Sequence, residues 1–550
     1  MYMELLKPLL WVCSNFRAIA YPLYCRCFDL WLHNTCDDEP ESWDIQSNPF
    51  GLPYSALHLV KLLTIQLSDA DFYSEDTMNL RSQAPGGGCV FPLVRVLTIY
   101  IATDQLDGKS DGSETDEASD IDEVDWVEEP SQYDTIDPRT VEANINAFVQ
   151  GVKEMMPMLN KVRVEFNRVS DFPAVTRRYI DRLTKQLFQI VKRIEYIDDG
   201  KRPVPLTLEV DGICRLSHFK CNQEYDGTQL VVLARLNAPT LQSLDLSVKM
   251  KHPASTLIQN DDGSYVTYPQ LVFLKMWWSS AISLHQPVFS RDVMPFPNLR
   301  LVEMIPWYPF GDDIIFRGNA AMLEHLSMKL YAPTVNMLRR HSVFTPTSHP
   351  RLWHVSITYD GNLIPDTFAT YEEGVLFLLS IGPGALVREI NDYGGIYSSA
   401  TVLAQLGRHT NIRTLDLGHI RLDLWDVITL IKSLPLLSYL RSLYPKLGAL
   451  PEGVAKDELP AYVIATHAPI GERFRRWDFR GYMAAESEVD VAICVLVLAL
   501  ACPTFVYATI DIMFRDDLTR WMQMALSLDL FCPYLPRLKE MFTHFQGCPM

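Results

Sequence analysis

The side chains best suited to chemistry are scattered along the chain and do not cluster. His325 and His354 stand at equivalent positions in two similar phrases, "HLSM" and "HVSI". A catalytic base needs a partner group in reach, whereas each histidine here lies between core aliphatic residues. We interpret both as exposed strand residues and not as a catalytic pair. The neighbours Asp312 and Asp313 follow "PWYPFG", where adjacent carboxylates mark a turn more often than an acid/base couple.

Motifs for phosphate, zinc or cofactor binding are missing from the sequence. "PGGGCVFP" around Gly86 lacks the lysine and the following helix of a phosphate-binding loop, and no H-E-x-x-H pair occurs. The 11 cysteines include no CxxC pair and no Cys/His spacing typical of zinc. We therefore expect a protein that is not an enzyme, with no cofactor and no metal. An odd number of scattered cysteines is typical of a reducing compartment, which predicts a cytoplasmic or nuclear location.

Charge and hydropathy exclude further classes of protein. The chain of 550 residues carries a net charge of −18, and no stretch resembles a basic surface for nucleic acid. The N-terminal apolar run is interrupted by Pro8, Arg17 and Arg26, which is unlike a signal peptide. The apolar run from Val491 to Cys502 is shorter than the roughly 20 residues of a membrane span. We expect neither nucleic acid nor membrane as a partner.

One phrase recurs along the chain: often a proline, then aliphatic residues in the order L-x-x-L-x-L. The copies are "HLVKLLTI" (58–65), "PLVRVLTI" (92–99), "PMLNKVRV" (157–164), "PTLQSLDL" (239–246), "PQLVFLKM" (269–276), "PNLRLVEM" (297–304), "AMLEHLSM" (321–328), "PRLWHVSI" (350–357), "TNIRTLDL" (410–417), "PLLSYLRS" (435–442), "PTFVYATI" (503–510) and "PRLKEMFT" (536–543). The last two aliphatic positions alternate, as in a short strand with one buried face. The proline, which has no N–H group to donate, is expected at the first residue of that strand.

The spacing of the copies predicts a repeat array. Their first leucines at 241, 271, 299, 323 and 352 follow at steps of 30, 28, 24 and 29 residues, and the 60 residues from 352 to 412 leave room for a degenerate unit. Helical spacing of apolar residues precedes several copies, as in "NINAFVQGVKEMMPM" and "LDLWDVITLIKSLP". "EVDVAICVLVLALACP" is apolar on all sides, as expected of a helix packed between neighbours. The sequence thus predicts an α/β fold, a leucine-rich-repeat-like curved solenoid over 37–550 with parallel strands on the concave face and helices outside. A generic α/β domain with a buried parallel sheet is the alternative.

An acidic insertion, 103–138, interrupts the pattern. Between Asp104 and Asp137 there are 14 Asp and Glu residues and one Lys, a charge of −13, which leaves −18 + 13 = −5 for the rest of the chain. Without it, the step between neighbouring copies falls to one normal unit. We expect a disordered loop grafted into a repeat. It is either a solvated loop without function or a recognition tail for basic partners, and Ser113 and Ser119 fit an acidic-directed kinase pattern.

The concave face of such an array is the expected binding surface, formed by residues that alternate with the buried aliphatics. Mixed charge with an aromatic anchor is typical of a protein-binding face. A merely solvated face is the alternative. Trp277 is the favoured anchor, unless it or Trp278 packs under a loop. The predicted partner-binding residues are Ser243, Asp245, Lys275, Trp277, Glu303, His325, His354 and Asp416.

With the repeats established, the N-terminal stretch "LLWVCSNFRAIAYPLY" resembles the second half of an F-box. The residues that carry this resemblance are Leu9, Leu10, Val12, Cys13, Phe16 and Arg17. We expect a partial F-box-like helical segment over 1–36. Together with the repeats, and with "FPLVRVLTIY", "LPAYVIATHAPIGERFRRW" and "LPRLKEMF", the chain resembles uncharacterised fungal F-box/leucine-rich-repeat proteins.

That resemblance implies a function. F-box proteins bind a Skp-type adaptor and carry a captured substrate to a cullin-type ubiquitin ligase. By the resemblance, the residues from Leu9 to Arg17 would dock the adaptor and the repeats would hold the substrate. An interaction scaffold without a ligase connection is the alternative. In either case we expect protein partners and a chain that is monomeric outside its complex.

Overall fold

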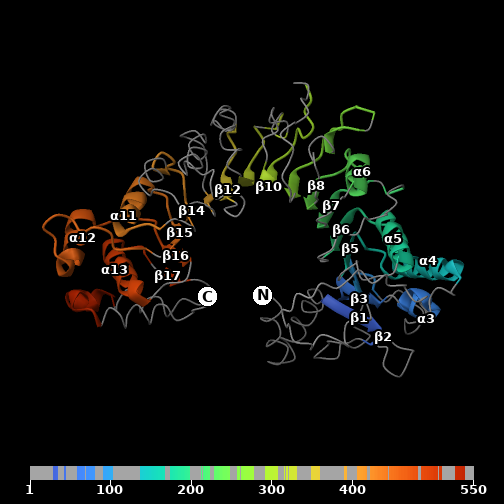
Figure 1. Cartoon of the computed structure of the whole chain (residues 1–550), viewed down its shortest axis with the longest axis horizontal. Coiled ribbons are helices and arrows are strands. Elements are labelled where there is room, and N and C mark those ends of the chain that lie inside the picture. The colour runs from blue at the N-terminus through green and yellow to red at the C-terminus, as the bar shows by residue number, and fades with distance from the viewer. Residues whose placement is uncertain are drawn as a thin grey trace, which may run out of the picture. The chain divides into compact units, whose positions relative to one another are not determined.

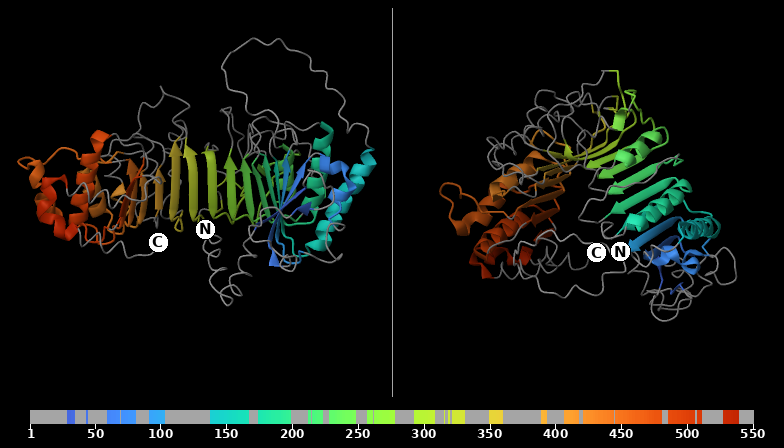
Figure 2. Two further views of the ribbon diagram at one scale, coloured as in Figure 1. Left: turned by 90° about the horizontal axis from the view of Figure 1, so that it is seen from below. Right: turned by 45° about the vertical axis from the view of Figure 1, so that its right-hand side comes forward.

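The structure is a computed structural model of the chain (Figures 1 and 2). It divides into two compact units, unit 1 (Met1–Pro287) and unit 2 (Val288–Met550). The residues that it describes are 29–34, 43–44, 59–68, 70–80, 91–102, 137–166, 174–198, 212–213, 215–222, 228–247, 257–260, 262–277, 292–307, 315, 318–319, 321–330, 349–359, 389–392, 406–417, 421–443, 445–480, 485–505, 507–510 and 527–538.

Unit 1 is a ladder of parallel strands, each of which pairs with the next strand along the chain. The strands are β3 (Leu62–Ser68), β4 (Val96–Ala102), β5 (Lys161–Phe166), β6 (Arg193–Asp198), β7 (His218–Asn222), β8 (Ser243–Ser247) and β9 (Phe273–Trp277). β1 (Asp29–Asn34) pairs in parallel with β3 and antiparallel with β2 (Trp43–Asp44). Strands that pair in chain order are the signature of a solenoid.

Helices lie on one side of this ladder (Figure 1). They are η2 (Ala70–Tyr73), α3 (Glu75–Met78), α4 (Pro138–Met155), α5 (Ala174–Gln189) and α6 (Thr228–Leu236). The predicted apolar positions of α4, among them Ile145, Phe148 and Val152, are fully buried. α4 begins with an N-cap at Asp137, whose Oδ1 accepts from the Arg139 N–H at 3.0 Å. The acidic insertion therefore ends at the cap of a packed helix.

Unit 2 repeats the arrangement with eight described strands. They are β10 (Leu301–Trp307), β11 (His325–Leu330), β12 (His354–Tyr359), β13 (Glu389–Asp392), β14 (Thr414–Leu417), β15 (Tyr439–Leu443), β16 (Arg476–Arg480) and β17 (Tyr507–Ile510). All pair in parallel and in chain order. The helical elements are α11 (Leu424–Ser433), η7 (Lys456–Glu458), α12 (Leu459–His467), α13 (Ala485–Ala501) and η8 (Asp529–Tyr534). β13 is the degenerate unit expected between 352 and 412.

The core of each unit is built from the aliphatic positions of the repeated phrase. The leading residues Leu241, Leu271, Leu299, Leu323, Leu352, Ile412 and Leu437 are all at most 1% exposed. In β5 the burial alternates strictly, with Val162, Val164 and Phe166 inside. α13 is buried all round from Val491 to Ala501, as the sequence predicts. The predicted leucine-rich-repeat-like solenoid fold is confirmed by this topology.

Three expectations need correction. The proline is not the first residue of a strand: Pro269, for instance, lies in a turn closed by the Leu271 N–H on the Tyr268 carbonyl at 3.3 Å, and β9 begins only at Phe273. This places proline second in the turn, where its fixed φ is favourable. Residues 29–34 form β1 and not a helix, because "DLWLHN" has alternating leucines that suit a strand. In "PRLKEMFT", residues 536–538 are helical, and the remainder lies outside the described residues.

Other expectations fall on residues that the structure does not describe. These are the F-box-like stretch through Arg17 and the acidic insertion up to residue 136. β4 and β5, which flank the insertion in sequence, nevertheless pair directly over six residues, from Val96 with Lys161 to Ile101 with Phe166. The insertion therefore separates two strands that are neighbours in the ladder, as a graft into one repeat requires.

Candidate interaction surface

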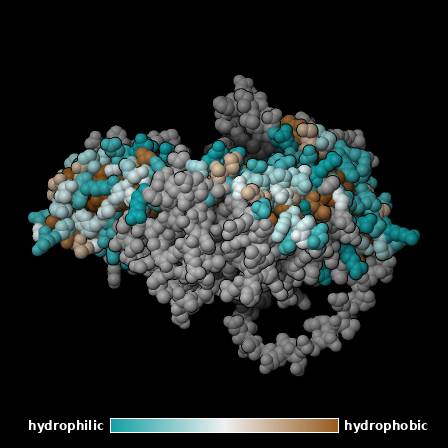
Figure 3. Space-filling model, turned by 90° about the horizontal axis from the view of Figure 1, so that it is seen from above, coloured by the Kyte–Doolittle hydropathy of each residue, from teal (hydrophilic) through white to brown (hydrophobic). Residues whose placement is uncertain are grey.

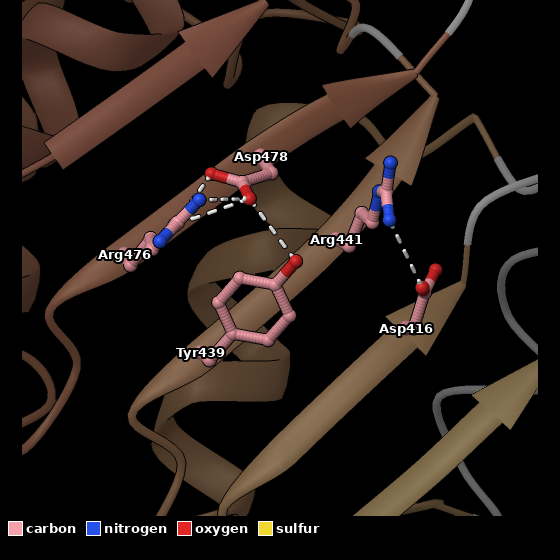
Figure 4. Close-up of polar contacts among 5 residues, drawn as sticks. All are labelled: Asp416, Tyr439, Arg441, Arg476 and Asp478. Carbon is pink, nitrogen blue, oxygen red and sulfur yellow. Dashed lines mark hydrogen bonds and ion pairs between the residues drawn. The ribbon is translucent and has the colours of Figure 1, made fainter. Parts of the chain in front are cut away.

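The side of the strands opposite the helices carries the side chains that alternate with the core, and we call it the inner face. In unit 2, β14, β15 and β16 align so that Asp416, Arg441 and Asp478 share one row across the strands. Tyr439 and Arg476 share the neighbouring row. Register alone therefore brings five polar side chains from three separate repeats together (Figure 4).

A hydrogen-bonded network joins three of these residues. The Tyr439 hydroxyl donates to Asp478 Oδ2 at 3.0 Å. The Arg476 guanidinium donates two hydrogen bonds to the same carboxylate, from Nε to Oδ1 at 2.9 Å and from Nη2 to Oδ2 at 2.8 Å. Arg476 also lies over the Tyr439 ring, 5.5 Å from its centroid, within cation–π range. Both oxygens of Asp478 therefore accept hydrogen bonds, and the Tyr439 ring is held on one side by a cation.

Arg441 and Asp416 form the second part of the cluster. Arg441 Nη1 lies 3.7 Å from Asp416 Oδ2, with side chains 21% and 5% exposed. The distance is that of an ion pair without a short hydrogen bond. Since the Asp416 side chain is almost buried, its charge depends on nearby cations for compensation.

The electrostatics of the cluster suit recognition better than acid/base chemistry. Burial, together with the charge of Asp478 and the hydrogen bond to it, raises the pKa of Tyr439 to about 12. The phenol therefore stays protonated at neutral pH and acts as a donor. The Asp478 carboxylate already accepts hydrogen bonds from three donors, one on Tyr439 and two on Arg476, so its oxygens are engaged within the cluster. By contrast, the Arg476 side chain is 50% exposed and can contact a partner.

His325 and His354 occupy the same register position on β11 and β12, as their equivalent places in the repeats predict. Their rings stack, with centroids 4.0 Å apart and planes 5° from parallel. His354 is only 9% exposed, because His325 covers one face of its ring and Trp353 meets it edge-on. The expectation that both are exposed is therefore wrong for His354.

The remaining predicted residues of the inner face divide between the two units. In unit 1, Ser243 and Asp245 lie on β8, and Asp245 is in register with Lys275 of β9. Trp277 ends β9, but its side chain lies outside the described part of the structure. In unit 2, Glu303 lies half-buried on β10, in register with Ser327. Whether these residues bind a partner stays a prediction.

Four residues of the cluster are not among those predicted from the sequence: Tyr439, Arg441, Arg476 and Asp478. The first two alternate with core residues in the recognised copy "PLLSYLRS", so the period-two pattern alone could have found them. Arg476 and Asp478 lie on β16, whose phrase "FRRWDF" has no proline and places aromatic residues at the core positions. Trp477 and Phe479 are nonetheless buried as leucine would be.

Other kinds of site were sought in the described part of the chain. No group of three or more His, Cys, Asp or Glu side chains there could hold a metal ion. Nor is any described helix both long and apolar enough to cross a membrane. In Figure 3 teal, hydrophilic surface prevails among the described residues of the face shown, and brown residues are scattered. The predicted adaptor-docking residues from Leu9 to Arg17 lie outside the described residues.

The chain was compared with known families, curated proteins and solved structures. No known protein family matches the chain, and no curated protein matches it either. Among solved structures, it is similar to the TLR13–ssRNA13 complex with a TM-score of 0.36 and 11% identity, over 80% of this chain and 45% of that one. A protein from Bacteroides fragilis is similar with a TM-score of 0.26 and 15% identity, over 52% of this chain and 65% of that one. The chain thus spans less than two thirds of either protein's length.

Proposed function

We propose that the chain is a non-enzymatic protein–protein interaction module whose inner face in unit 2 binds a protein partner. The observation that carries the proposal is the cluster on β14, β15 and β16. Tyr and Arg, with Trp, are the side chains enriched in binding hot spots. Tyr439 and Arg476 are held in place by Asp478 before any partner arrives, so binding orders little more.

We further propose that the module is the substrate-recognition subunit of a cullin-type ubiquitin ligase. The resemblance of the residues from Leu9 to Arg17 to the second half of an F-box supports this step. In that arrangement the N-terminal stretch docks a Skp-type adaptor and the inner face of the repeats holds the substrate. An interaction scaffold without a ligase connection shares the inner face but not the adaptor.

The interaction proposal is tested by affinity capture with the full chain as bait. The double variant Tyr439→Ala/Arg476→Ala should lose partners that the unchanged chain captures reproducibly. Arg473→Ala is the matched control, because Arg473 is an exposed arginine just before β16 and outside the cluster. Partners retained equally by the double variant and the control would overturn the assignment of the binding face.

The ligase proposal needs a separate measurement. Purified Skp-type adaptor should bind the full chain, and Leu10→Asp/Phe16→Asp should abolish this binding without affecting partner capture. A captured partner should also be ubiquitinated less in cells that lack the chain. Partner capture without adaptor binding, and with unchanged ubiquitination, would favour the scaffold.

A further inference from the structure

Unit 1 carries a row of basic side chains on its inner face. Lys161 of β5, Arg193 of β6 and His218 of β7 occupy the same register position on three neighbouring strands. Since parallel strands lie about 4.8 Å apart, the row spans about 10 Å. Lys220, two residues beyond His218, belongs to the next row. Each of these side chains alternates with buried core residues, so all four lie on the inner face.

Carboxylates nearby neutralise only part of this charge. Lys161 Nζ lies 2.7 Å from Glu195 Oε1, and Arg163 pairs with Glu165 and, at 3.9 Å, with Glu195. Within the described part of unit 1, the side chains of Arg193 and Lys220 form no ion pair. These six charged side chains on β5, β6 and β7 therefore sum to +4 − 2 = +2, in a chain whose net charge is −18.

The pKa of His218 is affected by this local excess of positive charge. Burial, followed by the charges of Arg193 and Lys161, lowers the pKa of His218. Ser217 Oγ lies 2.9 Å from His218 Nδ1 and fixes the ring. A neutral imidazole held between cations can become charged when an anion arrives, which would add a further donor to the bound anion.

We propose that Lys161, Arg193, His218 and Lys220 bind one phosphate group carried by a peptide segment of a protein partner. The proposal rests on the chain being an interaction module and not on the ligase connection. A phosphorylated side chain brings a charge near −2 and three acceptor oxygens. Arg193 and Lys220 supply positive charges that form no ion pair with a described carboxylate. An arginine can also donate to two phosphate oxygens at once.

The surroundings favour one phosphate over the backbone of a nucleic acid. Binding a nucleic acid needs a basic track for successive phosphates. Here the next row along the strands contains Glu195, and Asp245 one strand beyond Lys220, while Glu165 lies in the row after that. These carboxylates would repel the next phosphates along a backbone, whereas a peptide with one phosphate meets only the row.

The test is binding of phosphopeptides to the full chain. A degenerate peptide array, each peptide present with phosphoserine and with serine at its centre, selects a phosphopeptide. Its affinity is then measured by fluorescence anisotropy. Arg193→Ala should weaken binding by about 10-fold or more, the effect of losing hydrogen bonds to a charged group. Arg193→Lys should recover part of it. The control Arg178→Ala, an exposed arginine of α5, should bind as the unchanged chain does.

Several outcomes would overturn the proposal. One is an array on which no peptide binds, or on which serine and phosphoserine peptides bind equally. Another is phosphopeptide binding that Arg193→Ala leaves intact. A third is tight, salt-sensitive binding of a 12-nucleotide oligothymidylate that Arg193→Ala removes, with no phosphopeptide binding. Arg473→Ala of unit 2, an exposed arginine outside both sites, should leave phosphopeptide affinity within about 2-fold. Partner capture by the unit 2 surface is a separate assay, so failure of this site and failure of that surface are distinguishable.

Discussion

The Tyr439 hydroxyl donates a 3.0 Å hydrogen bond to Asp478 Oδ2, and so links two repeats at residues 39 positions apart in sequence. The bond belongs to the inner face and is only half-buried. We predict that Tyr439→Phe lowers the free energy of unfolding by about 1 kcal/mol, the usual net worth of one hydrogen bond. The loss stays moderate because Arg476 continues to satisfy Asp478.

Urea denaturation followed by circular dichroism checks this value. Tyr462→Phe is the matched control, because Tyr462 is a half-buried tyrosine of α12 whose hydroxyl makes no hydrogen bond to any described residue. It should change the midpoint little. Equal losses of unfolding free energy in the two variants would mean that the hydrogen bond from the Tyr439 hydroxyl does not stabilise the fold.

Asn237 and Asn319 hold equivalent places, four residues before the leading leucine of a strand, and both are buried. Asn237 Nδ2 donates to the carbonyls of Ile213 and Leu233 at 3.0 and 2.9 Å, and its Oδ1 accepts from the Leu216 N–H at 2.9 Å. The Asn237 side chain thereby links the turn of its own repeat to the backbone of the preceding repeat.

We predict that Asn237→Ala lowers the free energy of unfolding by about 3 kcal/mol, because it leaves buried backbone groups without partners. Asn319→Ala should cost less. Asn319 Nδ2 also donates to two carbonyls, but its Oδ1 accepts no hydrogen bond in the described part of unit 2. Chemical denaturation of the two variants gives the comparison, and a larger loss at Asn319 would contradict the assigned role of Oδ1.

The sequence reveals the solenoid because one physical requirement repeats in every unit. The leading aliphatic and the two alternating ones must be buried, and so Leu241, Leu271 and Leu299 can be recognised without a structure. Strands β6, β7 and β16 were not predicted from the sequence, because their buried positions are filled without the full repeated phrase. Val191, Leu216 and Phe474 lead them without a proline before them.

The polar cluster of unit 2 was only partly predictable. Alternation shows that Asp416 lies on the inner face, but not which side chain it meets. Its neighbour Arg441 and the more distant Asp478 come from later repeats, separated by loops of unequal length. Register between repeats decides these contacts, and it depends on where each turn begins rather than on the strand pattern.

Gly471 illustrates a residue whose need for glycine only the structure reveals. Its φ is +58°, and a Cβ there would overlap the Cγ2 methyl of Ile431 on α11. We predict that Gly471→Ala lowers the free energy of unfolding by about 3 kcal/mol, from backbone strain and overpacking together. Gly453→Ala is the control, with φ +79° but no atom within 4 Å of the added methyl, and should cost about 1 kcal/mol.

Thermal and urea unfolding of the two alanine variants measure the difference. The strain at positive φ is common to both, so the excess loss at Gly471 reports the contact with Ile431. In the double variant Gly471→Ala/Ile431→Val the overlapping Cγ2 methyl is kept, whereas Gly471→Ala/Ile431→Ala removes it and should recover part of the excess loss. If Gly471→Ala is no worse than Gly453→Ala, α11 does not pack as tightly as described.

His349 precedes β12 and is 3% exposed, and this burial lowers its pKa to about 4. Above pH 6.5 the imidazole is neutral in both states and contributes nothing to the pH dependence. As the pH falls below 6.5, His349 takes up a proton in the unfolded chain, whereas in the folded chain it stays neutral until about pH 4. Stability is therefore lost between pH 6.5 and pH 4, by at most about 3 kcal/mol for this group.

We predict that His349→Gln removes this part of the pH dependence, so that the difference in unfolding free energy between pH 7 and pH 5 shrinks by about 2 kcal/mol. Urea denaturation at the two pH values measures it, and comparing each variant with itself cancels any loss common to both pH values. His467→Gln is the control. Burial and the Lys432 charge also lower the pKa of His467, but it is half-exposed, so its effect should be smaller. An unchanged slope in His349→Gln would show that His349 does not resist protonation in the folded protein.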